Sequence, residues 1–343
     1  MKRLLNTLFV TTQGAYLSKD NQNVVVSVDR DIMLQVPIHL LGGIVCFGNV
    51  MCSPFLFGMC GENNVHISFL TKNGRFLARV HGPVSGNVLL RRAQYRTADD
   101  EITCADVAAN IVTAKVANCR NVLLRAKRDR NEDQRVASME SALRHLVRSL
   151  DKLAKEKSLG EIRGIEGEAA KTYFNVFDKL ITARKDNFFF HGRNKRPPLD
   201  NTNALLSFLY TILAHDVGSA LEAVGLDPAV GFLHRDRPGR HGLALDLMEE
   251  LRPYLADRLT LSLINRQQVK SSGFTKTESG AVMMDDATRK TVLTAWQKRK
   301  QDEITHPFIN EKIELGLLPH VQAMLMARFL RGDLDGYPPF IWK

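Results

Sequence analysis

The sequence predicts an α+β protein in which an N-terminal antiparallel β-sheet or sandwich domain precedes a larger all-α domain. Short β-branched and aromatic runs separated by turn residues fill the first part of the chain, and from Asp99 onward the hydrophobic period becomes helical. A chain of 343 residues also exceeds the usual size of one hydrophobic core. We therefore expect two domains, residues 1–95 and residues 96–343, with the change between Tyr95 and Glu101.

The N-terminal strands are predicted from short apolar runs and one turn. Val, Ile and Phe are enriched in the runs, and Gly, Asn, Asp or Pro lies between them. The dipeptide Asn73-Gly74 separates two such segments, which is a strong local signal for a hairpin. These features favour an antiparallel sheet or sandwich whose strands include Leu8–Val10, Val24–Val28, Gly43–Phe47 and Val65–Leu70.

The remainder of the chain is predicted to be mostly helical. Strands are followed by helices rather than alternating with them, which argues against a parallel nucleotide-binding sheet, and neither GxGxxG nor GxxxxGK(S/T) occurs. The mixed-charge stretch Arg125–Arg135 is expected to form an exposed turn between two helices. We expect a polar hairpin or loop over Phe274–Met284, followed by a helix that Asp285-Asp286 caps and that ends near Lys300.

The composition indicates a basic globular protein. Lysine and arginine outnumber aspartate and glutamate by 47 to 37, and the net charge of +10 favours a polyanionic partner such as nucleic acid, although ribosomal proteins, membrane-surface proteins and many enzymes share it. The apolar run that starts at Met1 is interrupted too early for a signal peptide, and no other segment approaches the length of a membrane span. We expect a cytoplasmic protein without membrane association. Five cysteines without a CxxC pair favour core residues or idle thiols over disulfides.

One carboxylate lies on the apolar face of a predicted helix. Between Glu161 and Thr182, helical stepping gathers the apolar side chains on one broad face, and Glu166 projects from its centre. Because an unpaired buried charge is costly, Glu166 is a metal ligand or general acid/base, the partner of a lysine or arginine from another helix, or a residue where the helix emerges into solvent. Gly164 and Gly167 beside it would let other backbone or a ligand approach closely.

A loop with a histidine and three arginines precedes a second helix. His234 lies in this loop, and Asp246, Glu249 and Glu250 share one face of the helix that follows. Taken singly, the acidic face is most simply solvated and His234 structural. Crowded carboxylates repel one another unless a cation such as that of Arg252 or a metal lies among them. Carboxylate oxygens with one imidazole suit Mg²⁺ or Mn²⁺, with a preference for Mn²⁺, whereas Zn²⁺ usually takes more nitrogen or sulfur ligands.

Two basic segments are candidates for contacts with phosphate. The first is the loop around His234, because guanidinium groups beside a metal ion hold phosphate oxygens. The second is His191–Pro198, for which a solvated loop is an equal alternative. The candidate DNA- and phosphate-binding residues are Arg193, Arg196, Arg235, Arg237, Arg240 and Arg252.

Four motifs stand out along the helical part of the chain. They are Gly164-Ile-Glu166-Gly-x-Ala-Ala-x-x-Tyr173, Arg196-Pro-Pro-x-Asp200-x-x-Asn203, Gly231-Phe-Leu-His234 and Leu243-Ala-Leu-Asp246-Leu-Met-Glu249. These motifs resemble those of the Cas1 family, the integrase of CRISPR adaptation. The tail Tyr337-Pro-Pro-Phe340 is also similar, and the order of a β-rich part and a helical part agrees over essentially the whole chain. In their detailed sequence the motifs resemble the versions found in type I-C systems.

The resemblance implies a metal site and an assembly. In the family the metal ligands are a glutamate on a helix, a histidine, and an acid from the next helix, which fall here on Glu166, His234 and Glu249, with Asp246 as a supporting acid. It also implies a homodimer formed through the β-rich domain. Two such dimers clamp a dimer of the small Cas2 protein, and spacer DNA lies across the assembly, which works at the nucleoid of a prokaryotic cell.

The resemblance further implies metal-dependent transesterification. The 3′-hydroxyl of a spacer attacks a phosphate at the boundary of the CRISPR repeat, and with water in place of that hydroxyl the same site cleaves DNA as an endonuclease. A stand-alone metal-dependent nuclease, which needs no Cas2 partner, is the first alternative. A non-catalytic DNA-binding scaffold, in which the acids merely pair with arginines, is the second.

Overall fold

The computed structural model describes residues 6–80, 82, 88–128, 135–155 and 158–342. Contacts within the chain divide it into two compact units, Met1–Ser85 with Met284–Asp302, and Gly86–Met283 with Glu303–Lys343. The boundary expected near residue 95 therefore lies at Ser85 instead, and a segment from late in the chain belongs to the first unit. Local periodicity carries no sign of such long-range packing, which explains the difference.

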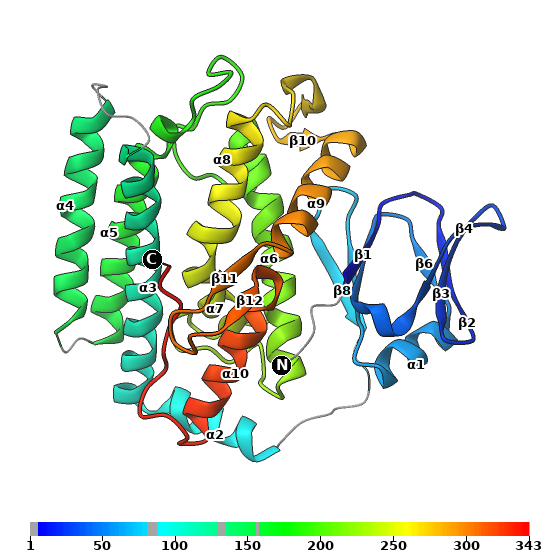
Figure 1. Cartoon of the computed structure of the whole chain (residues 1–343), viewed down its shortest axis with the longest axis horizontal. Helices are drawn as coiled ribbons and strands as arrows, with labels where there is room; N and C mark the ends of the chain where they lie inside the picture. The colour runs from blue at the N-terminus through cyan, green and yellow to red at the C-terminus, as the bar shows by residue number, and fades with distance from the viewer. Residues whose placement is uncertain (1–5, 81, 83–87, 129–134, 156–157, 343) are drawn as a thin grey trace. The chain divides into compact units, whose positions relative to one another are not determined.

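The first unit is built on two four-stranded sheets. Its strands are β1 (Asn6–Val10), β2 (Tyr16–Asp20), β3 (Asn23–Val28), β4 (Asp31–Pro37), β5 (Leu41–Phe47), β6 (Met51–Cys52), β7 (His66–Leu70) and β8 (Phe76–Val80). One sheet has the order β1-β5-β7-β8 and the other the order β4-β3-β2-β6 (Figure 1). The pairs β1–β5, β5–β7 and β2–β6 are parallel, and the other pairs are antiparallel.

The β-rich first unit and the helical second unit confirm the α+β class, but the sheets are mixed rather than antiparallel. Short apolar runs show where strands lie and not in which direction they pair, so the parallel pairs could not be predicted from them. The expected hairpin is present: β7 pairs with β8 antiparallel, and Gly74 in the turn has a φ of +87°. Glycine adopts this left-handed conformation without steric cost.

Two helices complete the first unit, α1 (Pro54–Glu62) and α9 (Asp286–Lys300). Ser53 caps α1 by accepting a hydrogen bond from the backbone of Leu56. The side chain of Gln297 on α9 donates to the carbonyl of Thr7 at 2.7 Å, which ties this late helix to β1. The core of the unit contains fully buried aliphatic side chains from both sheets and from α1, among them Leu17, Val24, Ile44, Leu56 and Ile67.

The second unit consists mainly of helices. They are α2 (Val88–Asp99), α3 (Glu101–Arg128), α4 (Arg135–Leu153), α5 (Leu159–Phe177), α6 (Asn201–Ala223), α7 (Gly242–Arg252), α8 (Arg258–Asn265) and α10 (Leu318–Leu330), with a π-helical segment at Pro253–Asp257. Helices α3, α4 and α5 lie side by side (Figure 1), and α7 packs against α3, α6 and α10. The unit is not purely helical, because it also contains the short pairs β9 (Phe274–Lys276) with β10 (Val282–Met284) and β11 (Glu303–Thr305) with β12 (Lys312–Glu314). Short 3₁₀ turns occur at Ile38–Leu40, Asp178–Leu180, Ser271–Gly273 and Leu315–Leu317.

Two caps fix where the central helices begin. The hydroxyl of Ser158 accepts a hydrogen bond from the backbone of Glu161, and the Glu161 carboxylate accepts one from the Ser158 N–H at 2.9 Å, a capping box that starts α5. Asp200 accepts a hydrogen bond from the Asn203 N–H at 2.7 Å and starts α6. The caps thereby set which side chains of α5 and α6 face the inside of the unit.

Three local predictions can be compared directly with the structure. The hairpin over Phe274–Met284 is confirmed by the pairing of β9 with β10. The capped helix is also confirmed, since Asp285 accepts a hydrogen bond from the Thr288 N–H at 2.7 Å at the start of α9. The predicted turn between Arg125 and Arg135 falls largely on residues 129–134, outside the described residues; α3 ends before it and α4 begins after it.

Helix α6 is long and apolar enough to cross a membrane by length and composition, contrary to the expectation from sequence. However, 67% of its most apolar stretch is buried inside the protein. Most of this stretch therefore packs against other parts of the protein, as in a core helix. The cysteines are free thiols, as expected.

Candidate active site

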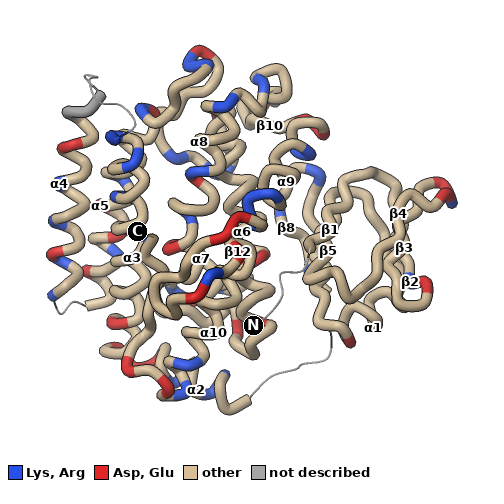
Figure 2. The backbone as a smooth tube through the Cα atoms, in the orientation of Figure 1, with Lys and Arg blue, Asp and Glu red and all other residues tan. Residues whose placement is uncertain are grey.

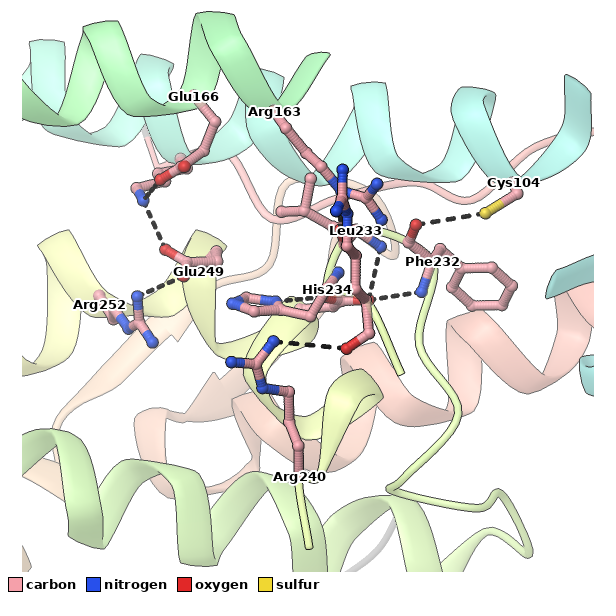
Figure 3. Close-up of polar contacts among 12 residues, drawn as sticks. Cys104, Arg163, Glu166, Phe232, Leu233, His234, Arg240, Glu249 and Arg252 are labelled. Atoms are coloured by element: carbon pink, nitrogen blue, oxygen red, sulfur yellow. Dashed lines mark hydrogen bonds and ion pairs between the residues drawn. The ribbon is translucent and has the colours of Figure 1, made fainter. Parts of the chain in front are cut away.

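The candidate site is built around a buried lysine that the motifs do not single out. Lys115 on α3 forms ion pairs with Glu166 on α5 and with Glu249 on α7, the latter at 2.7 Å between Nζ and Oε2. Glu166 and Glu249 point toward one another from their two helices (Figure 3). Arg252, one turn after Glu249, forms an ion pair with the other oxygen of that carboxylate. Two carboxylates and two cations therefore meet where α3, α5 and α7 pack together.

Burial controls the electrostatics of this cluster. The side chains of Lys115 and Glu249 are only 10% and 4% exposed. Burial raises the pKa of Glu249, but Arg252 and Lys115 outweigh this effect and hold that pKa at about 2. Burial likewise lowers the pKa of Lys115, and Glu249 and Glu166 reverse it, so that the pKa lies above its ordinary value. Glu249 and Lys115 are therefore both charged at neutral pH.

Of the alternatives considered for Glu166, the structure contains the ion pair with a lysine from another helix. The Glu166 side chain is 26% exposed, so it lies at the rim of the buried region rather than at its centre. No other backbone approaches Gly164 or Gly167, because a Cβ added to either glycine meets nothing within 4 Å, whereas the close approach of a ligand stays a prediction. Both glycines face open space next to the site.

The loop that carries His234 is held by one buried aspartate. Asp246 on α7 accepts hydrogen bonds from the backbone N–H groups of Phe232, Leu233 and His234 at 2.6 to 2.9 Å. Its Oδ1 also lies 2.6 Å from Nδ1 of His234. Because an ionised carboxylate only accepts, Nδ1 is the donor, and in the neutral form of the ring Nε2 keeps a lone pair. In its protonated form, the ring lies near enough to Glu249 to help lower the pKa of that residue.

The three acids of α7 do not form a solvated face, which corrects the simplest interpretation of the sequence. Asp246, Glu249 and Glu250 are all buried, and each has different partners. Glu250 accepts hydrogen bonds from the Tyr337 hydroxyl at 2.5 Å and from the Phe340 N–H at 2.7 Å, and burial raises its pKa to about 7. Glu250 therefore anchors the C-terminal segment, whereas Asp246 and Glu249 belong to the site.

A layer of aromatic and acidic side chains supports the site from behind. The hydroxyl of Tyr210 donates to Asp257 at 2.6 Å, and the hydroxyl of Tyr173 donates to the other oxygen of the same carboxylate at 3.1 Å. The guanidinium groups of Arg252 and Arg193 lie 5.0 and 5.2 Å from the centre of the Tyr210 ring. Burial raises the pKa of Asp257 to about 6 despite the two hydrogen bonds. This network holds Arg252 in place against Glu249.

Arg193 and Arg252 are fixed parts of the wall of the site. Arg193 donates hydrogen bonds to the side chains of Asn203 and Ser207 at 2.8 and 3.1 Å. Lys195, which the sequence analysis missed, has a lowered pKa because of burial and because of the nearby charges of Arg252 and Arg193. In the described part of the chain, no acceptor meets the buried Nε–H of Arg252. Clustered cations with a free donor favour an anion such as phosphate.

The other candidate arginines lie in loops. Arg196, Arg235 and Arg237 are exposed, and Arg240 donates to the carbonyl of Arg235 at 3.4 Å. Figure 2 shows that positive and negative residues are interspersed along the chain rather than gathered in one tract. The excess positive charge is therefore spread over the molecule, and local arginines and lysines define the basic character of the site.

A pocket of about 270 Å³ lies beside His234. Its lining includes Tyr95 from α2 and Arg163 from α5. Arg163, one turn before Glu166, donates a hydrogen bond to the carbonyl of Leu233 at 2.6 Å (Figure 3). This residue, which sequence reasoning also missed, links α5 directly to the loop that carries His234.

The side chains present fit a divalent cation in part. Glu166 and Glu249 both contact the ammonium of Lys115, and no other donor among the described residues reaches the buried Oε2 of Glu249. His234 offers Nε2 as a further ligand. Among the residues that the structure describes, however, no three His, Cys, Asp or Glu side chains are grouped to hold a metal ion. The structure thus brings two of the three expected ligands together, with Lys115 between them.

Two acids with a nearby histidine, lined by cations, are side chains of the kind that enzymes acting on phosphodiesters use with a metal ion. The chain belongs to the Cas1 family: residues 8–298 match the family model described as CRISPR associated protein Cas1. It is 55% identical over 343 residues to the CRISPR-associated endonuclease Cas1 1 of Chlorobaculum tepidum, with 100% of both chains covered. The resemblance noted in the sequence is confirmed at the level of the family.

Two solved structures show the same fold. The first is a casposase bound to integration product, with a TM-score of 0.84 and 22% identity over 99% of this chain and 95% of that chain. The second is a Cas6-RT-Cas1–Cas2 complex, with a TM-score of 0.82 and 22% identity over 100% of this chain and 36% of that chain. At this level of identity, both likenesses concern the fold alone.

Proposed function

We propose that this protein is a CRISPR-adaptation integrase that inserts spacer DNA at the boundary of a repeat by metal-dependent transesterification. Glu166, His234 and Glu249 are the proposed ligands of Mg²⁺ or Mn²⁺, and Asp246 orients His234. The observation that carries the proposal is the convergence of Glu166 and Glu249, with His234 nearby, in a site lined by cations. Membership of the Cas1 family supports it, as does the fold shared with a casposase bound to integration product.

Each side chain has a distinct role in the proposed reaction. A bound divalent cation supplies positive charge that stabilises the oxygens of the phosphodiester during substitution. Glu166 and Glu249 would hold this cation through carboxylate oxygens, and His234 would hold it through Nε2. Arg252 holds Glu249 through its guanidinium and adds positive charge close to the phosphodiester.

The chemistry needs no external energy source because one phosphodiester replaces another. The oxygen of the spacer's 3′-hydroxyl forms a bond to phosphorus and loses its proton. The bond from phosphorus to the 3′-oxygen of the repeat strand breaks, and that oxygen takes up a proton. With water as the nucleophile, the same side chains support endonuclease cleavage. The exposed Arg196, Arg235 and Arg237 contact DNA phosphates outside the site, and so does Arg240.

The proposed assembly is a homodimer, two of which bind a Cas2 dimer with spacer DNA and the CRISPR repeat. β4 supports an interface in the first unit, because it lies at the edge of its sheet and exposes three consecutive apolar side chains, Ile32, Met33 and Leu34. The fold shared with a Cas6-RT-Cas1–Cas2 complex supports Cas2 as the partner. We place the assembly in the prokaryotic cytoplasm at the nucleoid, in a system of type I-C.

A strand-transfer assay tests the proposal. Labelled spacer-like DNA and a target with repeats are incubated with the protein in Mg²⁺ or Mn²⁺, with and without Cas2. Glu166→Ala and His234→Ala should abolish strand transfer and Mn²⁺-dependent cleavage while DNA binding persists. Glu168→Ala, which changes an exposed acid on the same helix that contacts His145, is the matched control and should retain activity.

Other outcomes favour the competing functions. Wild-type activity in Glu166→Ala or His234→Ala contradicts the assignment of the site. Cleavage by the wild type without strand transfer, even with Cas2 present, favours a stand-alone nuclease. DNA binding without any reaction favours a scaffold.

A further inference from the structure

Lys115 lies between two proposed metal ligands. Its Nζ contacts Oε1 of Glu166 and lies 2.7 Å from Oε2 of Glu249. The lysine reaches these acids from α3, a third helix, and its side chain is only 10% exposed. An ammonium group is therefore held at the point where the two carboxylates converge.

The contact of Lys115 with Glu249 leaves a lone pair of the Glu249 carboxylate unused. Nζ lies 2.7 Å from Oε2, which is hydrogen-bonding distance, and no other donor in the described part of the chain reaches this buried oxygen. Arg252 holds the same carboxylate through its other oxygen. A carboxylate oxygen that accepts from one donor keeps a second lone pair that another cation can use.

Charge balance decides what happens when a divalent cation enters. The carboxylates of Glu166 and Glu249 face the cations of Lys115 and Arg252, so the cluster is neutral without a metal. A divalent ion added to this buried set would leave it strongly positive, and the cations would repel one another. Lys115 is the group that can move, because its stem is flexible, whereas Arg252 is stacked on Tyr210.

We propose that Lys115 is the resident counter-ion of the acid pair and that a divalent cation enters the site by displacing its ammonium from Glu166 and Glu249. This inference rests on the proposed metal chemistry and adds an exchange of cations to it. In the absence of metal, the lysine prevents repulsion between the two acids. After the exchange, its ammonium no longer pairs with either acid.

The first test compares Lys115→Met with Lys127→Met. Lys127 lies on the same helix and pairs with Glu140 at 2.7 Å, which makes it the matched control. In EDTA, Lys115→Met should unfold about 3 °C or more below the wild type, and Mn²⁺ should restore its stability. Its affinity for Mn²⁺, measured by the loss of the EPR signal of free ion, should rise about tenfold, because the ion no longer competes with an ammonium. Lys127→Met should match the wild type in its Mn²⁺ response.

The second test uses the wild-type chain and does not depend on the folding of a variant. Lysines are acetylated with acetic anhydride and quantified by peptide mass spectrometry. Lys115 should react several-fold faster in Mg²⁺ than in EDTA, since displacement frees its amine from the acids, while the rate at Lys127 stays unchanged.

Two results would overturn the inference, and they differ in whether the proposed metal site survives. In the first case, the wild type binds Mn²⁺ and Glu166→Gln does not, so the proposed metal site stands. The displacement is then wrong if a folded Lys115→Met binds Mn²⁺ no more tightly than the wild type, or if Lys115 is acetylated at the same rate in Mg²⁺ and in EDTA. If neither the wild type nor Lys115→Met binds Mn²⁺, the proposed metal site fails together with the displacement.

Discussion

Nδ1 of His234 lies 2.6 Å from Oδ1 of Asp246, and the same carboxylate accepts the N–H groups of three consecutive residues of the loop. One buried aspartate therefore fixes both the backbone that carries the histidine and the tautomer of its ring. Asp246 lies on α7, one turn before Glu249. The placement of two proposed ligands thus depends on the same helix.

Asp246→Asn should reduce strand transfer by about 10- to 100-fold. The asparagine offers one acceptor oxygen where the aspartate offers two, so its amide meets N–H donors and the ring of His234 loses its fixed tautomer. The ¹⁵N chemical shifts of the His234 ring report the tautomer directly. A variant with wild-type ring shifts and a wild-type rate would show that Asp246 does not orient His234.

Gly231→Ala should destabilise the second unit by about 3 kcal/mol, at the upper end of overpacking effects. A Cβ at this position would lie 2.5 Å from Oδ2 of Asp246, 2.7 Å from the carbonyl carbon of Gly242 and 2.8 Å from the backbone nitrogen of Leu243. The backbone cannot move aside without breaking the hydrogen bonds to Asp246. Urea denaturation measures the loss, with Gly58→Ala as a control, because nothing lies within 4 Å of its added Cβ. Equal stability of the two variants contradicts the prediction.

Glu166 could be identified from sequence because helical periodicity alone places it among apolar neighbours. The same reasoning applies to Lys115, which lies between Ala114 and Val116 on a helix whose inner face is buried, although no sequence motif includes this lysine. A charged residue among the apolar residues on one face of a helix is the pattern that identifies both Glu166 and Lys115.

Other features depend on contacts that no local pattern encodes. The spacing of the acids on α7 predicts a shared face, but only the partners from other elements show that Glu250 anchors the C-terminal segment while Glu249 joins the site. The parallel pairing of β1 with β5 and the return of α9 to the first unit are likewise long-range contacts. Fold class and separate elements could therefore be predicted, whereas strand direction and unit boundaries could not.

Asp257→Asn should change the pH dependence of stability. The pKa of Asp257 is raised from 3.8 to about 6 in the folded chain, mainly by burial, so between these values the folded state binds a proton that the unfolded state releases. This contribution is fully present below pH 3.8 and is lost as the pH rises through about 6. Relative to the asparagine variant, the wild type should lose stability on the order of 2 kcal/mol between about pH 4 and about pH 7.

Urea denaturation of both proteins across this range measures the effect of Asp257. Because every other group is shared, the difference between the two proteins isolates this residue. A difference that is flat, or that grows in favour of the wild type as the pH rises, contradicts the raised pKa.

Gly164→Ala and Gly167→Ala should each stabilise α5 by about 1 kcal/mol, because alanine is the better helix former and its Cβ meets no atom within 4 Å at either position. Thermal unfolding measures this gain. The same two glycines flank Glu166 on the open side of the site, so strand transfer and DNA affinity should be measured on the same variants. A gain in stability with unchanged DNA binding means that DNA does not approach this face of α5, and a loss of DNA affinity means that it does. A loss of stability would contradict the open surroundings of both glycines.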